Sequence, residues 1–137
     1  MFSRFSLIPF PFLFFVLLFL SFGQGLQAQN LDCKRFKNGT FKIEGKELGT
    51  WLITRNGNKQ VEVETNSNIT VEFNVKWIDD CTYKLTATRK TRKAFPTVYK
   101  SMEITTRIIE VKANSYFVVT TSTDSKEEDS CEVLVVD

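Results

Sequence analysis

From about residue 40 onward, apolar and polar residues alternate in short runs. The clearest run is residues 69–77, in which five apolar side chains alternate with four polar ones. A period of two is typical of a strand with one face in a protein core. Alternation or β-branched content predicts further strands, about eight in all, at residues 40–44, 48–55, 61–64, 83–88, 102–111, 116–123 and 131–136.

On the strand predicted at residues 61–64, the alternation assigns the two faces. Val61 and Val63 would face the core, and Glu62 and Glu64 would form a solvated face. On this interpretation the two glutamates are not an acid/base pair.

Turn-forming residues separate the predicted strands. Asn56-Gly57-Asn58 is the strongest hairpin signal, and Asp79-Asp80 favours a turn through bonds from side chain to backbone. The one longer gap, residues 89–100, contains Pro96 and shows no helical period, whereas residues 31–36 allow a helical turn. Short strands joined by short turns predict an all-β antiparallel meander that closes into a small barrel, with a β-sandwich as the alternative.

The first 28 residues have a different character. Arg4 precedes an almost wholly apolar run over residues 5–20, and Leu26-Gln27-Ala28 supplies a small residue for cleavage. We therefore expect a signal peptide at residues 1–28 and a single β domain at residues 29–137. The unbroken apolar stretch, residues 12–20, is shorter than the ~20 residues that span a bilayer. This predicts export to the periplasm or the medium without a membrane span after cleavage; a retained anchor is the alternative.

Composition excludes several functional classes. The chain has no His, which removes Ser-His-Asp and Cys-His catalysis and most zinc sites. Neither a CxxC motif nor a glycine-rich phosphate loop is present. The net charge of +2 lacks the basic excess of nucleic-acid-binding proteins. We predict no enzyme activity, no cofactor, no metal and no nucleic-acid partner.

Two charge clusters and one polar group are the remaining candidates for a site. The basic cluster, residues 89–93 with Lys100, and the acidic cluster, residues 124–129, are interpreted as solvated loops; an anion site is the alternative for the basic one. Arg55 and Gln60 flank a predicted hairpin turn and would pair across it. Arg55, Gln60 and the aromatic Trp51 are the candidate ligand-binding residues.

The cysteines leave the disulfide open. Cys33, Cys81 and Cys131 allow three pairings, and an exported chain favours one disulfide. Nothing in their spacing selects one of the three.

Two resemblances add to this picture. Lys37-Asn38-Gly39-Thr40-Phe41 resembles the opening of a lipocalin-like barrel, in which a Gly-x-aromatic motif begins the first strand and the aromatic plugs one end. Gly49-Thr50-Trp51 matches the Gly-x-Trp form one hairpin later. The resemblance implies a lipocalin-like small barrel.

The second resemblance covers most of the chain after the predicted signal peptide. Residues 33–41, the group Arg55, Gln60 and Glu62, and Trp77 to Tyr83 together resemble an uncharacterised family of small exported bacterial proteins. Some members carry a DNA topoisomerase IV label, which the length and motifs of this chain do not support. The resemblance implies a Cys33–Cys81 disulfide, with Cys131 outside the shared pattern.

The sequence thus predicts a monomeric, non-enzymatic, exported β domain that binds a small or amphipathic ligand, or an envelope protein, in the cell envelope. The alternative is a structural or protein-interaction module without a ligand cavity. A closed barrel with an internal pocket would favour the first function, and a solid core would favour the second.

Overall fold

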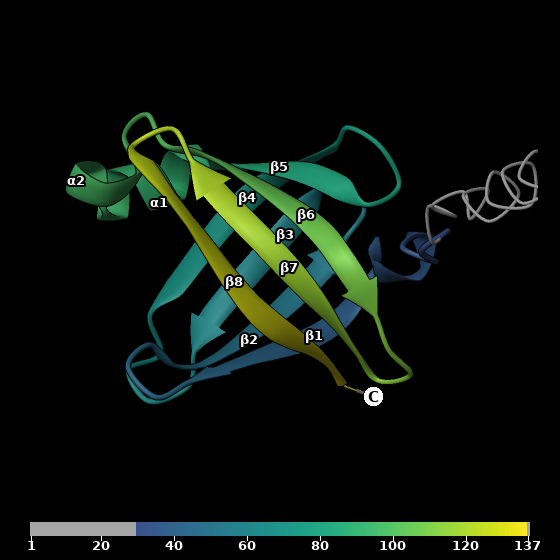
Figure 1. Cartoon of the computed structure of the whole chain (residues 1–137). Helices are drawn as coiled ribbons and strands as arrows, with labels where there is room; N and C mark the ends of the chain where they lie inside the picture. Colours follow the sequence, from purple (N-terminus) through teal and green to yellow (C-terminus); the bar gives the residue numbers. More distant parts are fainter. Residues whose placement is uncertain (1–29, 137) are drawn as a thin grey trace, which may run out of the picture. The chain divides into compact units, whose positions relative to one another are not determined.

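Eight antiparallel strands follow one another around a closed barrel in the order of the sequence (Figure 1). The structure, a computed structural model, describes residues 30–136, so the predicted signal peptide lies outside the described residues. The strands are β1 (Gly39–Gly45), β2 (Gly49–Asn56), β3 (Lys59–Glu64), β4 (Thr70–Trp77), β5 (Thr82–Ala87), β6 (Glu103–Val111), β7 (Ser115–Ser122) and β8 (Ser125–Val136). The closed meander confirms the predicted barrel rather than the sandwich.

Three short helices complete the described part. The 3₁₀ helix η1 (Lys34–Phe36) precedes β1 and confirms the helical turn that the sequence allowed at residues 31–36. The helices α1 (Arg89–Ala94) and α2 (Pro96–Tyr99) lie between β5 and β6, where only an irregular connection was predicted. Thr88 caps α1 by accepting a hydrogen bond from the Thr91 amide, and Pro96 occupies the first turn of α2. Helices this short do not display a period of 3.6 residues.

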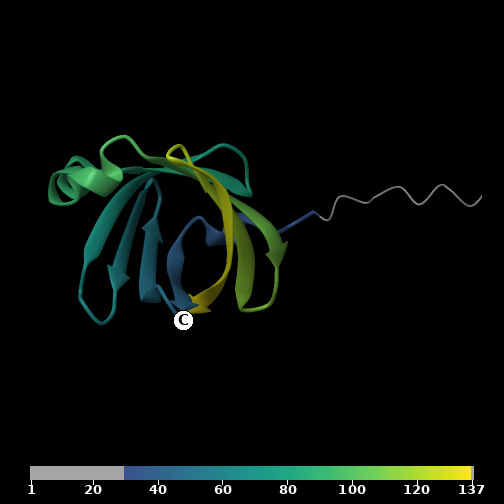
Figure 2. The ribbon, with the colours of Figure 1, turned by 60° about the vertical axis from the view of Figure 1, so that its left-hand side comes forward.

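The two ends of the barrel differ (Figure 1). Helix η1 and the connections after β2, β4 and β6 lie at one end, which we call the closed end. The connections after β1, β3, β5 and β7, with α1 and α2 among them, lie at the other end, which we call the mouth. In Figure 2 the strands form a ring and the α1–α2 segment projects from one side of it.

Strand β8 is longer than the sequence predicted. It begins at Ser125 rather than at Cys131, so most of the acidic cluster belongs to a strand and not to a loop. Asp129 pairs with Thr120 and Ser130 with Val119 across the β7–β8 hairpin. This part of β8 is exposed and lies beyond the residues that pair with β1, so its charged side chains stay in water and do not oppose strand formation. No ion pair joins the acidic and basic clusters within residues 30–136.

The predicted faces of β3 are wrong. Gln60 is buried and Glu62 faces the barrel interior, so Val61 and Val63 face outward. The register explains the inversion: Glu62 lies opposite Ile53 on β2 and Val71 on β4, which are both buried. A strand between two neighbours must place its side chains on the face that their register sets. Glu64 instead accepts hydrogen bonds from Asn66 and Ser67 at the mouth-end turn.

The interior side chains form two apolar clusters on opposite sides of the barrel. One gathers side chains of η1, β1, β2 and β6–β8 and includes Phe36, Phe41 and Tyr116. The other gathers side chains of β4 and β5 and includes Phe73 and Leu85. An eight-stranded barrel is just wide enough for its side chains or for one small ligand. The core is therefore divided, and the space between the clusters is where a ligand would fit.

A disulfide joins Cys33 to Cys81, with a Cα–Cα distance of 5.2 Å. It ties the start of η1 to the β4–β5 connection at the closed end. This is the pairing that the family resemblance implied. Cys131 is a free, half-buried thiol.

One seam closes the barrel. Strands β1 and β8 pair over Thr40–Lys42 and Leu134–Val136, near the closed end. We call these three residue pairs the β1–β8 seam. Toward the mouth, β8 continues alongside β7, and Ile43 of β1 and Cys131 of β8 border a common cavity.

Candidate ligand-binding cavity

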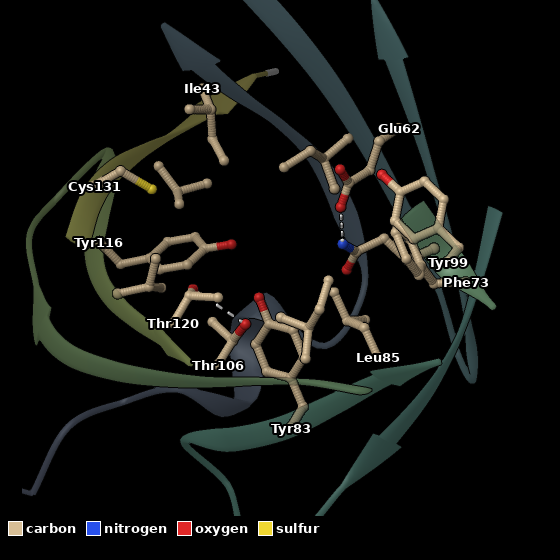
Figure 3. Close-up of a pocket in the computed structure, with 15 residues that line it drawn as sticks. Ile43, Glu62, Phe73, Tyr83, Leu85, Tyr99, Thr106, Tyr116, Thr120 and Cys131 are labelled. Atoms are coloured by element: carbon tan, nitrogen blue, oxygen red, sulfur yellow. Dashed lines mark hydrogen bonds between the residues drawn. The ribbon is translucent and has the colours of Figure 1, made fainter. Parts of the chain in front are cut away.

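A cavity of about 190 Å³ lies inside the barrel between the two apolar clusters (Figure 3). We call it the inner cavity. Its apolar walls come from both clusters, with Ile53 and Val118 from the first and Phe73 and Leu85 from the second. An engineered cavity of about 150 Å³ in another protein holds benzene, so this volume admits a ring-sized group.

A second cavity of about 580 Å³ opens at the mouth, and we call it the outer cavity. Glu47, Leu48 and Trp51 of the β1–β2 hairpin line it on one side, and β8 lines it on the other. Both cavities share the same five lining residues: Ile43, Glu62, Tyr99, Thr120 and Cys131. The outer cavity therefore leads into the inner one, and its volume falls within the range of small-molecule sites.

Glu62 carries the only carboxylate that borders both cavities, judged by the described lining residues. One of its oxygens accepts a hydrogen bond from the Gln60 amide at 2.6 Å (Figure 3). Burial raises the pKa of Glu62 above its usual value, and this effect exceeds the opposing influence of the Gln60 hydrogen bond and the Arg55 charge. The carboxyl is thus poorly solvated and has acceptor capacity left for a ligand.

Arg55 is buried beside this site rather than in its wall. Its side chain is 2% exposed and donates hydrogen bonds to Gln60 Oε1 at 2.7 Å, to the Phe36 carbonyl at 2.6 Å and to the Tyr83 hydroxyl at 2.9 Å. The guanidinium also lies 4.5 Å from the ring centroid of Tyr83 and 5.1 Å from that of Phe41. These contacts join η1, β2, β3 and β5 at the closed end, so Arg55 fills that end and orients Gln60.

Tyr116 places an unpartnered hydroxyl in the inner cavity. Its ring packs against that of Phe36, with the ring centroids 4.2 Å apart. Its hydroxyl points into the cavity (Figure 3). Within the described part of the chain this buried oxygen has no hydrogen-bond partner. Burial raises the pKa of Tyr116, so the group is a neutral hydroxyl at physiological pH. A buried polar atom without a partner is costly, and a ligand atom in the cavity would satisfy it.

The three residues proposed from the sequence lie in different places. Trp51 lines the outer cavity and donates its indole N–H to the Leu48 carbonyl at 2.8 Å. Gln60 lines the inner cavity, and Arg55 lines neither. Arg55 and Gln60 pair across the hairpin as predicted. Asp79 accepts a hydrogen bond from the Cys81 amide at 2.8 Å, which confirms its predicted role in a turn.

Sequence reasoning missed Glu62, Tyr99 and Tyr116 as cavity residues. Glu62 was assigned to the wrong face, and Tyr116 was predicted only as the first residue of a strand at residues 116–123. Tyr99 reaches the cavity from α2, and its ring packs on that of Phe73 with the ring centroids 5.6 Å apart. The signal that would have found Glu62 was its spacing from Gln60, because residues two apart on a strand share a face.

Comparisons with family models, with curated proteins and with solved structures found no match to this chain. Within residues 30–136, no helix is long and apolar enough to cross a bilayer. The function is therefore argued from the geometry of the two cavities.

The position of Glu62 predicts a pH-dependent stability. Glu62→Gln keeps an acceptor for Gln60 and removes the buried charge. The pKa of Glu62 is above 4.5 in the folded protein and close to 4.5 in the unfolded chain, so the folded protein holds the proton more tightly. The stability of the wild type relative to Glu62→Gln should be constant below pH 4.5 and should fall as the pH rises through the folded pKa.

Urea unfolding between pH 4 and pH 8 measures this difference. The control is Glu44→Gln, which removes an exposed carboxylate on β1 and should show no such fall. A wild type that gains stability over Glu62→Gln as the pH rises would contradict the raised pKa.

Proposed function

We propose that this protein is a non-enzymatic barrel that binds a small amphipathic ligand in the cell envelope. The observation that carries the proposal is the inner cavity, which continues into the outer cavity and has polar groups on otherwise apolar walls. An apolar portion of the ligand would occupy the inner cavity, and the polar portion would lie toward Glu62 and the mouth. A mixed lining of this kind is typical of small-molecule sites.

The disulfide supports the proposed location. Structural disulfides persist in oxidising compartments, so Cys33–Cys81 favours a place outside the cytoplasm. With the signal peptide expected at residues 1–28, we propose export to the periplasm or the medium. One chain encloses the whole inner cavity, which is consistent with a monomer as the binding unit.

Filling the cavity tests the proposal. Val118 and Val119 are neighbours on β7; Val118 lines the inner cavity, and Val119 points to the opposite face. The uncharged dye N-phenylnaphthylamine is larger than the inner cavity alone, so its phenyl ring would occupy the inner cavity and its naphthalene would lie in the outer one. Val118→Phe should weaken binding of this dye at least tenfold, because the new ring occupies the space of the phenyl group. Val119→Phe, the matched control, should bind like the wild type. Dye fluorescence measures binding, and circular dichroism confirms that both variants are folded.

Val133→Phe provides a second filling variant from β8 if Val118→Phe does not fold. Native mass spectrometry of the purified wild type would also show any small molecule that co-purifies. A wild type that neither binds the dye nor carries a bound small molecule would overturn the proposal. Equal dye binding by the folded Val118→Phe and Val119→Phe variants would place the dye outside the cavity.

A further inference from the structure

The charged groups that line the two cavities share one sign. Among the described lining residues, the ionisable carboxyls are Glu62 at the junction and Glu47 and Asp129 in the outer cavity, and no Lys or Arg lines either one. The basic residues of α1 do not contribute to the walls, although Tyr99 of the adjoining α2 does. A path into the barrel that passes three carboxyls favours a cation over an anion.

Arg55 does not donate a hydrogen bond directly to Glu62. The guanidinium is held by Gln60, Phe36 and Tyr83, and Gln60 stands between it and Glu62. Within residues 30–136, the bond from Gln60 is the one hydrogen bond that the Glu62 carboxyl receives. A carboxylate in an enclosed site normally accepts several donors or an ion pair. The remaining acceptor positions face the junction of the cavities, where a ligand would pass.

The volume of the inner cavity limits the size of the ligand group that can lie beyond Glu62. Its volume of about 190 Å³ suits a single ring with a short chain. Its walls are mostly aliphatic and aromatic, and the hydroxyl of Tyr116 is its buried polar group without a partner. A compact apolar body fits this space better than a long acyl chain.

We propose that the ligand is a protonated primary amine on a ring-sized apolar body, with the ring in the inner cavity and the ammonium group on Glu62. This inference rests on the proposed function and names the class of ligand. The ammonium would donate to the Glu62 carboxylate, and the acidic outer cavity would attract amines and disfavour carboxylates. A charge-assisted hydrogen bond in an enclosed site is among the stronger polar contacts.

A matched ligand series tests the class. The compounds 2-phenylethylamine, 2-phenylethanol and 3-phenylpropanoate carry the same ring and differ in the charge of the head group. Isothermal titration calorimetry at pH 7 should show the amine binding about tenfold or more tightly than the alcohol, because only the amine pairs a positive charge with the Glu62 carboxylate. The carboxylate should bind most weakly.

Two variants test whether Glu62 causes the preference for the amine over the alcohol. Glu62→Gln should reduce amine binding to the level of the alcohol and leave alcohol binding within about twofold of the wild type. Glu44→Gln, which removes a carboxylate outside the cavities, should keep the full preference for the amine. Binding of N-phenylnaphthylamine, which is uncharged, reports in parallel whether each variant retains an open cavity.

The outcomes separate the two proposals. Dye binding with an amine preference that Glu62→Gln removes supports both. Dye binding with no amine preference, or with a preference that survives in Glu62→Gln, overturns the amine inference and leaves the binding function standing. A wild type that binds neither the dye nor any of the three compounds overturns both.

Discussion

Arg55→Ala is expected to lower the free energy of unfolding by about 3–5 kcal/mol, as removal of one member of a buried charged network does. The substitution removes three hydrogen bonds and leaves acceptors on Gln60 and Phe36, and the Tyr83 hydroxyl, without that donor at the closed end. It also removes the cation nearest Glu62. For a domain with a typical stability of about 5–15 kcal/mol, this loss is a large share of the free energy of unfolding.

Chemical unfolding followed by circular dichroism measures the loss. Arg107 on β6 is the matched control, since its side chain is exposed, and Arg107→Ala should change stability by about 0.5 kcal/mol or less. Arg55→Met, which restores apolar volume without the charge, should remain destabilised because the same polar atoms still lack a donor. If Arg55→Ala cost no more than Arg107→Ala, Arg55 would not be holding the closed end together.

Removing the disulfide is expected to lower the free energy of unfolding by a similar amount. The Cys33–Cys81 bridge spans 48 residues, and the chain-entropy model assigns about 4 kcal/mol to a loop of that length. Cys33 is fully buried against Phe36 and its neighbours, so the bridge also fixes η1 over the closed end. The double variant Cys33→Ser/Cys81→Ser should therefore unfold at a much lower denaturant concentration than the wild type.

Cys131→Ser is the control for a cysteine that forms no bridge, and its stability should stay within about 1 kcal/mol of the wild type. Reducing the wild type should reproduce the loss seen in the double variant, while the double variant itself should not respond to reductant. Full stability of the reduced wild type would show that the bridge does not stabilise the fold. Dye binding by the double variant at low denaturant would show how far the cavity depends on the closed end.

The strand pattern predicted the fold well because most strands obey the rule on which the prediction rests. Residues 69–77 alternate strictly, and β4 buries Val71, Phe73 and Val75 as that alternation requires. Asn56-Gly57-Asn58 forms a turn in which Gly57 adopts a positive φ of 60°. Local preference and tertiary packing agree at these positions, so sequence alone is sufficient.

The candidate site was harder to predict because its residues break that rule. On β3 the polar residues Gln60 and Glu62 face inward, and hydrophobicity alone assigns the strand to the opposite orientation. The information that corrects it is the register with β2 and β4, which no single strand contains. Inward polar residues are the ones that a binding site would need, so the failure of the pattern coincides with the candidate site.

The β1–β8 seam has a consequence for how this chain folds. Seven of the eight strand pairings join neighbours in sequence, and the seam alone joins the first strand to the last. A contact between such distant segments carries the largest loop-closure cost, so we expect the seven local pairings to form first and the seam to form last. With three residue pairs, it should also exchange its amide hydrogens sooner than the β6–β7 and β7–β8 ladders. The barrel would thus begin as a curved open sheet that becomes a closed container in its final step.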